Sequence, residues 1–281
     1  MERHFRQIYV CGSMRSGTTI LQKVICLSPD VNPFGYGGRY LMEQMQLYIR
    51  YAGTDSVFIK DFFGGVDGFK AFNKDLVDSI YDKAWSNAGG PAALVLKSPE
   101  LSFIIPEILE ILGTSSRFVF SVREPKDTIA SMVRAGERQK RARLSTMLAR
   151  LGRDIDSLCG VYNRAYEPIL KLLDSSSPEL FNRFLFTKYE DLVTNPERTQ
   201  LDIYNFCELS SAPLPAEGKW RVSRKTEEIA THPKWSTYLT GLSGRPISAS
   251  SIGTFDSVLS PSECARIQRK CKFICDRFGY N

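Results

Sequence analysis

Short apolar runs alternate with stretches of helical periodicity along this chain. One apolar run begins at Ile8 and ends in Gly12, and further runs of strand length occupy residues 92–96, 117–122 and 183–187. Runs of this length bounded by turn residues are typical of strands that are buried on both faces. Residues 30–34 are expected to form a short strand or an extended segment.

Apolar residues at helical spacing fill most of the sequence between the strands. A helix is expected from Thr19 to near Leu27, and Asp127 is a plausible N-cap for the helix at 128–133. The other predicted helices cover 40–45, 73–87, 104–112, the region 144–173, 190–206 with a break at Asn195-Pro196, and 261–278. Residues 53–69 and 210–252 are rich in glycine, proline or serine, and we expect irregular surface segments there.

Strands that alternate with helices predict an α/β fold: a three-layer, doubly wound parallel sheet with helices on both faces. No internal repeat or linker divides the sequence, so residues 1–281 are expected to form a single domain. In such folds ligands bind at the carboxyl ends of the strands. The residues of interest at those ends are the 12–19 loop, Lys97, Arg123 and Tyr189.

The 12–19 loop is the strongest local signal. Its strand–loop–helix context and its Gly12-to-Gly17 spacing match the pattern G-x-x-x-x-G-K-[ST], whose backbone N–H groups cradle phosphates. Thr18 occupies the position of the lysine in that pattern, and the nearest cation is Arg15, inside the loop. The contact that this lysine makes to triphosphates is therefore missing, which argues against ordinary ATP or GTP hydrolysis.

Composition narrows the class of ligand. The chain is 43% hydrophobic and 24% charged, with a net charge of +6 that suits a small anionic ligand. Basic residues are not interleaved with aromatic ones, so nucleic acid is not an expected partner. No apolar run approaches the roughly 20 residues that span a bilayer, and the first strand leaves no room for a signal peptide. The seven cysteines include no CxxC pair and are expected to be buried, reduced thiols of a cytoplasmic protein.

Four motifs follow one another in strand context: RSGTT, LKSP, FSVREPKDTIASM and TKYEDLVTNPE. Together with the C-terminal stretch SSIGTFDSVLSPSECARIQRKCKFICDRFGY, this series resembles the sulfotransferase family, especially its bacterial members. The resemblance runs from Tyr9 to Tyr280. It implies a P-loop-like fold and transfer of a sulfuryl group from 3′-phosphoadenosine 5′-phosphosulfate (PAPS), which leaves adenosine 3′,5′-bisphosphate (PAP).

The resemblance assigns the 5′-phosphosulfate to the first motif. The backbone N–H groups of Ser16, Gly17, Thr18 and Thr19, with the two threonine hydroxyls, hold the phosphate and sulfate oxygens in this interpretation. Arg15 neutralises the bridging oxygen as the S–O bond breaks. The alternative is a tight glycine turn with a solvent-facing arginine.

Arg123 and Ser131 match the family's 3′-phosphate pair. An arginine at a strand end offers a bidentate fork to phosphate, although Arg123 could instead pair with Asp127 or Glu124. Lys97 matches the lysine that supports sulfuryl transfer by stabilising the leaving phosphate.

The general base is less well defined. Some relatives carry a histidine two residues after the lysine, where this chain has Pro99, and another branch carries a glutamate near residues 35–39, where this chain has no carboxylate. Glu43 is the first candidate and His232 the second. Glu100 and Asp61 are further candidates, because a base needs only hydrogen-bond reach to the acceptor and a suitable pKa.

The remaining matches concern the nucleoside. Tyr189 matches a tyrosine near the adenine, and Ser250, Ser251, Ile252 and Gly253 match a late loop that closes over the 3′-phosphate. Ile20 stands where the family often has a stacking tryptophan, and Arg245 could replace basic residues missing from the late loop. The seven basic residues within 134–153 form either a solvated helix face or a lid over an anion.

The sequence thus predicts a metal-independent, cytoplasmic sulfotransferase that uses PAPS and acts on a hydroxyl or nitrogen of a small-molecule acceptor, as in specialised metabolism. It gives no indication of the acceptor's identity or of the oligomeric state. A P-loop small-molecule kinase and a non-catalytic nucleotide-binding protein of the same fold are the alternatives.

Overall fold

The structure, a computed structural model, describes residues 5–35, 37–52, 57–112, 116–215, 219–223, 227–228, 231–232 and 245–280, without the side chains of Phe58 and Ile108. At its centre lie four parallel strands in the order β2-β1-β3-β4. Their bounds are β1 Arg6–Cys11, β2 Ala93–Lys97, β3 Ser116–Val122 and β4 Phe184–Lys188. The predicted α/β class and parallel sheet are confirmed.

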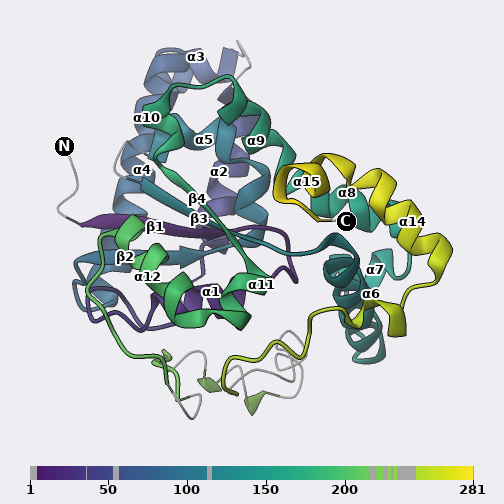
Figure 1. The fold of residues 1–281 in the computed structure, drawn as a ribbon. Coiled ribbons are helices and arrows are strands. Elements are labelled where there is room, and N and C mark those ends of the chain that lie inside the picture. The colour runs from purple at the N-terminus through teal and green to yellow at the C-terminus, as the bar shows by residue number, and fades with distance from the viewer. Residues whose placement is uncertain are drawn as a thin grey trace.

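Helices cover both faces of this sheet (Figure 1). The α-helices are α1 Thr18–Ile25, α2 Arg39–Ala52, α3 Val57–Phe63, α4 Val66–Asn87, α5 Ile105–Leu112, α6 Pro125–Arg141, α7 Met147–Leu151, α8 Ile155–Arg164, α9 Glu167–Asp174, α10 Pro178–Phe181, α11 Tyr189–Thr194, α12 Pro196–Cys207, α14 Pro261–Lys270 and α15 Lys272–Phe278. Two 3₁₀ helices, η1 Pro99–Phe103 and η3 Thr254–Ser257, complete the described elements. None of the described helices is both long enough and apolar enough to cross a membrane.

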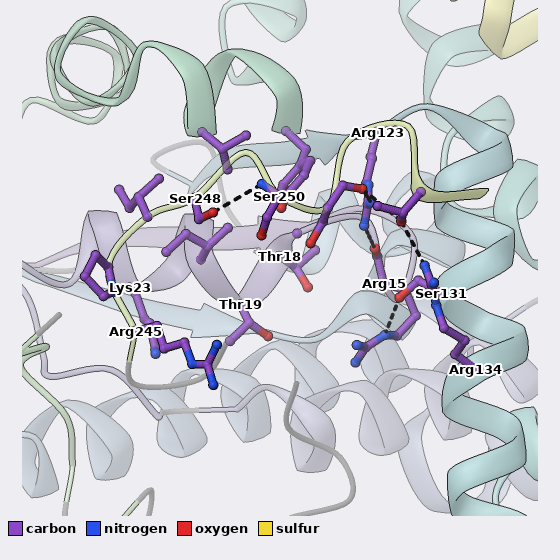
Figure 2. A pocket seen from close by; sticks show the side chains of 18 of the residues that line it. Arg15, Thr18, Thr19, Lys23, Arg123, Ser131, Arg134, Arg245, Ser248 and Ser250 are labelled. Carbon is purple, nitrogen blue, oxygen red and sulfur yellow. Dashed lines mark hydrogen bonds between the residues drawn. The ribbon is translucent and has the colours of Figure 1, made fainter. Parts of the chain in front are cut away.

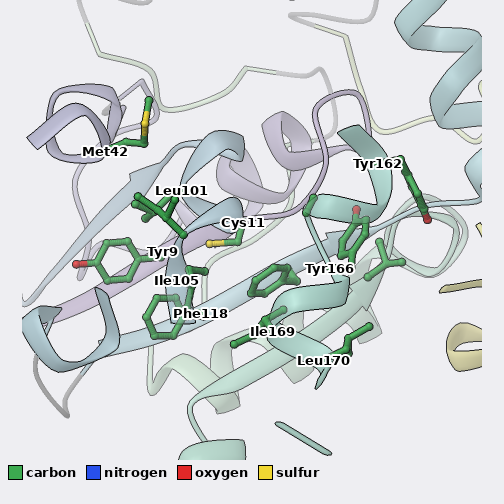
Figure 3. Close-up of a cluster of buried hydrophobic side chains, with 14 of the residues drawn as sticks. Tyr9, Cys11, Met42, Leu101, Ile105, Phe118, Tyr162, Tyr166, Ile169 and Leu170 are labelled. Atoms are coloured by element: carbon green, nitrogen blue, oxygen red, sulfur yellow. The ribbon is translucent and has the colours of Figure 1, made fainter. Parts of the chain in front are cut away.

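Alternate residues of the strands supply two separate cores. Tyr9 of β1 faces the larger core, where its ring stacks on Phe118, with 5.0 Å between centroids. The labelled residues of Figure 3 show this core continuing into Tyr166 and Ile169 of the α9 region. Ile8, the neighbour of Tyr9, faces the second core under α1 and α12. Burying each such side chain contributes about 1.5–3 kcal/mol, so both faces hold the strands in place.

The parallel register aligns the carboxyl ends of the four strands. In the parallel register Val10 lies beside Lys97, Cys11 beside Phe120, and Val122 beside Lys188. The chain segments that follow these four strand ends therefore meet at one edge of the sheet, as predicted.

Three predictions about elements were wrong. Part of the segment 53–69 is helical, because α3 ends at Phe63 and α4 begins at Val66, well before the predicted start at Asn73. The last helix is divided at Cys271 into α14 and α15.

The third error concerns the cap of α6. This helix begins at Pro125, and its N-cap is Glu124, whose carboxylate accepts a hydrogen bond from the Asp127 N–H at 2.8 Å. Proline fits a first helical position because its missing N–H has no partner to lose there. Asp127 therefore lies inside the first turn, and its carboxylate does not cap the helix.

Candidate active site

Two glycines give the loop between β1 and α1 its shape. Gly12 has φ 120° and Gly17 has φ 99°, both in the region that favours glycine. A Cβ at Gly12 would lie 2.4 Å from the Ser121 carbonyl oxygen, and one at Gly17 would lie 2.4 Å from Cδ2 of Tyr189. The loop thus packs directly against the ends of β3 and β4, with no room for a side chain at either position.

Ser16 fastens this loop to β3. Its Oγ lies 2.7 Å from the Ser13 carbonyl oxygen and 2.9 Å from that of Ser121, while the Ser121 hydroxyl donates to the Ser16 carbonyl at 2.7 Å. The Ser16 N–H donates to the Ser13 carbonyl. The polar groups of Ser16 therefore serve the loop itself, and Ser16 does not line the cavity beside it.

A cavity of ≈ 350 Å³ opens beside the loop. Figure 2 shows Thr18 and Thr19 in its middle, with Arg15, Arg123, Ser131 and Arg134 at one end and Lys23 and Arg245 at the other. Its described lining comprises Arg15, Gly17, Thr18, Thr19, Ile20, Lys23, Arg123, Ser131, Arg134, Arg138, Tyr189, Val193, Arg245, Pro246, Ile247, Ser248, Ser250, Ser251 and Thr254. These residues include six cations and no carboxylate, so the cavity suits an elongated anionic ligand.

Arg15 has an unusual backbone conformation and lies close to other positive charges. It has φ 71°, unusual for a residue other than glycine. Burial, together with the nearby positive charges of Arg138 and Arg123, lowers its pKa to about 10. Its Nε donates to the Ser131 hydroxyl at 3.3 Å. A bound anion would relieve the repulsion between these cations.

Arg123 is buried at the end of β3, with 5% of its surface exposed. Its guanidinium donates to the carbonyls of Arg15 and Ser251 and lies 4.6 Å from the Tyr189 ring centroid. Asp127 Oδ2 is 3.7 Å away, so the structural pairing that the sequence left open does occur. Arg123 Nε has no hydrogen-bond partner among the described residues and leaves a donor unsatisfied at this end of the cavity.

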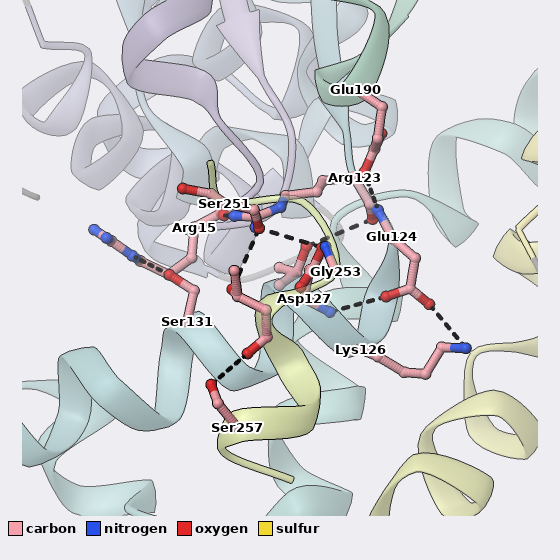
Figure 4. A network of polar contacts seen from close by, with 12 residues as sticks. Arg15, Arg123, Glu124, Lys126, Asp127, Ser131, Glu190, Ser251, Gly253 and Ser257 are labelled. Carbon is pink, nitrogen blue, oxygen red and sulfur yellow. Dashed lines mark hydrogen bonds and ion pairs between the residues drawn. The ribbon is translucent and has the colours of Figure 1, made fainter. Parts of the chain in front are cut away.

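Asp127 links α6 to the late loop. Its Oδ2 accepts a hydrogen bond from the Gly253 N–H at 2.7 Å, while Arg134 donates to the Thr254 hydroxyl at 2.9 Å (Figure 4). With the bond from Arg123 to Ser251, three side chains of the β3–α6 region hold the segment 251–254 against the cavity.

Lys97 ends β2 next to the loop. Its Nζ donates to the Thr19 hydroxyl at 3.2 Å. Burial lowers the pKa of Lys97 to about 8; the Glu100 carboxylate acts in the opposite direction, while Arg15 and Lys23 lower it further. Lys97 does not line the cavity itself, but it touches a threonine that does.

The structure brings most of the predicted cofactor residues together. Those that line the cavity are Arg15, Gly17, Thr18, Thr19, Arg123, Ser131, Tyr189 and Ser251. Ile252 is 37% exposed, and Gly253 contributes its N–H to Asp127 instead. The assignment of these residues to a cofactor remains a prediction.

The structure does not bring the two favoured bases to this cavity. Glu43 is exposed on α2 and pairs with Arg39 at 2.8 Å, and His232 is also exposed. Asp61 is exposed on α3. Glu100 is the candidate that lies near the strand ends, where its carboxylate accepts a hydrogen bond from the Ser98 hydroxyl at 3.1 Å.

Several lining residues were not predicted individually. Lys23 follows Thr19 by one helical turn on α1, and Arg134 and Arg138 follow Ser131 by one and two turns on α6. This i+3, i+4 and i+7 spacing was a usable signal, because such residues share one helix face. Val193 and Ile247, by contrast, carry no sequence signal for this position.

Comparisons with known proteins bear on the family and the fold of this chain. A model of the sulfotransferase family matches residues 7–213. No curated protein matches the chain.

Solved structures share its fold at low sequence identity. The sulfotransferase domain from the curacin biosynthetic pathway is 21% identical with a TM-score of 0.57, covering 97% of this chain and 99% of its own. The sulfotransferase domain from the Synechococcus PCC 7002 olefin synthase is 17% identical with a TM-score of 0.60, and the coverages are 100% and 97%. Sulfotransferase STF9 from Mycobacterium avium is 15% identical with a TM-score of 0.50, covering 100% of this chain and 78% of that one. The matched family model, which spans most of the sequence, shows that this chain belongs to the sulfotransferase family.

Proposed function

We propose that the protein transfers a sulfuryl group from PAPS to a hydroxyl or nitrogen of a small-molecule acceptor. The observation that carries the proposal is the cavity lined by six cations, in which Thr18 replaces the lysine of triphosphate-binding loops and Arg15 is the cation within the loop. The 5′-phosphosulfate lies against Gly17, Thr18 and Thr19, and the 3′-phosphate lies at the end formed by Arg123 and Ser131.

The chain's own residues supply the chemistry in this proposal. As the acceptor attacks sulfur, the S–O bond to the 5′-phosphate breaks and its electron pair stays on the phosphate oxygen. Arg15 and Lys97 stabilise that developing charge, and the ammonium form of Lys97 is needed for this. The products are PAP and a sulfate ester or sulfamate, and the proposal requires no metal.

A base must take the proton that the acceptor loses. Glu100 is the best-placed candidate, because its charge acts on Lys97 and its carboxylate is held by Ser98. We expect Glu100→Gln to lower kcat about 10²- to 10⁴-fold. Glu43→Gln and His232→Ala are the comparisons, and loss of turnover in either of them with full activity in Glu100→Gln would reverse this assignment.

The acceptor is proposed to be a specialised metabolite, and the site of action to be the cytoplasm. The first part is motivated by the fold shared with a domain of the curacin pathway. The second part is motivated by the seven free cysteines, six of them buried, which suit a reducing compartment.

Ligand-dependent thermal unfolding and a transfer assay test the proposal together. PAP without Mg²⁺ should raise the unfolding temperature, and labelled sulfate should pass from PAPS to members of a panel of alcohols, phenols, sugars and guanidines. Stabilisation by Mg-ATP with no response to PAP would favour a kinase. PAP binding without transfer to any acceptor would favour a nucleotide-binding protein that has lost activity.

A further inference from the structure

Lys23 is a mostly buried lysine that has no role in the proposed sulfuryl transfer. It lies on α1 with 6% of its surface exposed, and it lines the cavity at the end away from Arg123 (Figure 2). Among the described residues, no oxygen accepts a hydrogen bond from its ammonium group. Because Lys23 lines the cavity, a ligand bound there is the group that can accept hydrogen bonds from its ammonium.

Two aromatic rings hold the Lys23 side chain in place. Its Nζ lies 5.5 Å from the centroid of the Phe34 ring and 5.3 Å from that of Trp220. Trp220 Nε1 in turn donates to the Arg245 carbonyl at 3.2 Å. The rings attract the cation but cannot themselves accept ordinary hydrogen bonds from its N–H donors.

The cavity lining also includes four aliphatic side chains, those of Ile20, Val193, Pro246 and Ile247. Pro246 and Ile247 directly follow Arg245, which lies at the same end as Lys23. Ile20 precedes Lys23 by one helical turn, so both side chains lie on the face of α1 that borders the cavity. Apolar walls beside a lysine donor that two rings hold in place suit a flat heteroaromatic ring with nitrogen lone pairs at its edge, and Arg245 adds a second cation at this end.

We propose that Lys23 is a specificity-determining residue that donates a hydrogen bond to a ring nitrogen of the nucleotide base. The inference rests on the proposed function, which places both anionic groups of PAP elsewhere along the cavity and leaves this end for the adenine.

Binding measurements with two ligands separate this role from a general electrostatic one. The ligands are PAP and 1-O-methylribose 3,5-bisphosphate, which carries both phosphates but no base. We expect Lys23→Met to weaken PAP binding about 10-fold or more and to change binding of the base-free ligand less than about 2-fold. Lys23→Arg, which keeps a donor, should retain more of the PAP affinity than Lys23→Met.

Lys83→Met provides the matched control, because it removes an exposed lysine of α4 that does not line the cavity. Thermal unfolding without ligand checks that each variant is folded. Should Lys23→Met be unfolded, PAP analogues with one ring nitrogen replaced by carbon give the same information on the unaltered protein. One of these analogues should then bind about 10-fold or more weakly than PAP, because it cannot accept the hydrogen bond from Lys23.

The outcomes distinguish the two proposals. Equal weakening of both ligands, or no weakening of either, would overturn the role of Lys23 while leaving PAP binding intact. If the unaltered protein bound neither bisphosphate, the proposed function itself would fail, and this inference with it.

Discussion

Single residues at the strand ends set the chemistry of the cavity, and Gly17 does so through its lack of a side chain. Its φ is 99°, and a Cβ at this position would lie 2.4 Å from Cδ2 of Tyr189, so there is no acceptable place for a methyl group. A side chain there must displace the loop, and with it Thr18 and Thr19, which line the cavity.

Gly17→Ala is expected to lower the free energy of unfolding by about 1–3 kcal/mol and to weaken PAP binding. Gly160→Ala is the matched control, because Gly160 lies within α8 and a Cβ there meets nothing within 4 Å. That control should gain about 0.5–1 kcal/mol from helix propensity. Chemical denaturation and calorimetry measure both quantities, and an unperturbed Gly17→Ala protein would contradict the close packing described for the loop.

Lys97 gives the site a dependence on pH. Its pKa of about 8 in the free protein lies below the ordinary lysine value because the ammonium is buried. A bound anion stabilises the charged form and raises that pKa, so binding takes up protons near pH 8. PAP affinity is therefore expected to fall as the pH rises through 8 toward the pKa of the complex.

Calorimetry of PAP binding at pH 8, in buffers of different ionisation enthalpy, counts these protons. Lys97→Met should abolish most of the uptake, whereas Lys83→Met should leave it unchanged. Equal uptake in Lys97→Met and in the unaltered protein would assign the titration to another group.

At the scale of elements, the segment 251–254 depends on the first turn of α6. Asp127 binds the Gly253 N–H and faces Arg123, and both side chains of this i,i+4 pair are nearly buried. Removing one partner of a buried pair strands the other charge, which costs more than the loss of an exposed pair.

Asp127→Ala is accordingly expected to lower the free energy of unfolding by about 3–5 kcal/mol. It should also speed hydrogen exchange at residues 251–254. Asp276→Ala is the control, because Asp276 forms an i,i+4 pair with Lys272 that is largely exposed, and its loss should have little effect. Similar stability of the two variants would mean that Asp127 does not anchor the late loop.

The elements themselves were predictable to different degrees. All four strands were predicted because a strand buried on both faces needs a continuous apolar run. Helix α3 and the start of α4 were not predicted, because the pair Gly64-Gly65 is typical of an irregular segment. In the structure these glycines adopt φ of 70° and 117°. They connect two helices, and the rings of Phe63 and Phe69 pack together with 5.0 Å between their centroids.

The residues of the site were also predictable to different degrees. The cavity-lining residues of the loop and of β3–α6 belong to contiguous motifs, so their proximity could be predicted from strand ends alone. Glu43 and His232 were chosen by chain position, but whether a side chain reaches a cavity depends on how its segment packs. For Lys23, the spacing from Thr19 could indicate the helix face, but the contacts of its ammonium with Phe34 and Trp220 could not be predicted, because Trp220 is distant in the sequence.

At the scale of the whole molecule, charge is concentrated where the ligand is expected. The chain has a net charge of +6, and six cations line one cavity. Such a cavity attracts anions over about one Debye length, which is about 8 Å at physiological ionic strength.

The association rate constant of PAP is therefore expected to fall as salt is added. Arg138→Met should slow association about 3- to 10-fold at low salt and flatten the salt dependence, because Arg138 lines the cavity. Arg141→Met removes the same charge from the exposed end of α6 and should have a smaller effect. Stopped-flow measurements at several ionic strengths compare them, and identical behaviour of the two variants would argue against local steering.

The internal bonding of Ser16 and Ser121 has a consequence for turnover. The hydroxyl and the carbonyl of Ser16 are already bonded to Ser121 of β3, so this part of the loop is held in place without a ligand. Under the proposed function, we expect nucleotide departure to depend on residues 251–254, which Arg123, Asp127 and Arg134 hold against the cavity. We therefore expect the time that the product stays bound to depend on these contacts, and Arg134, which bonds to Thr254, tests this most directly.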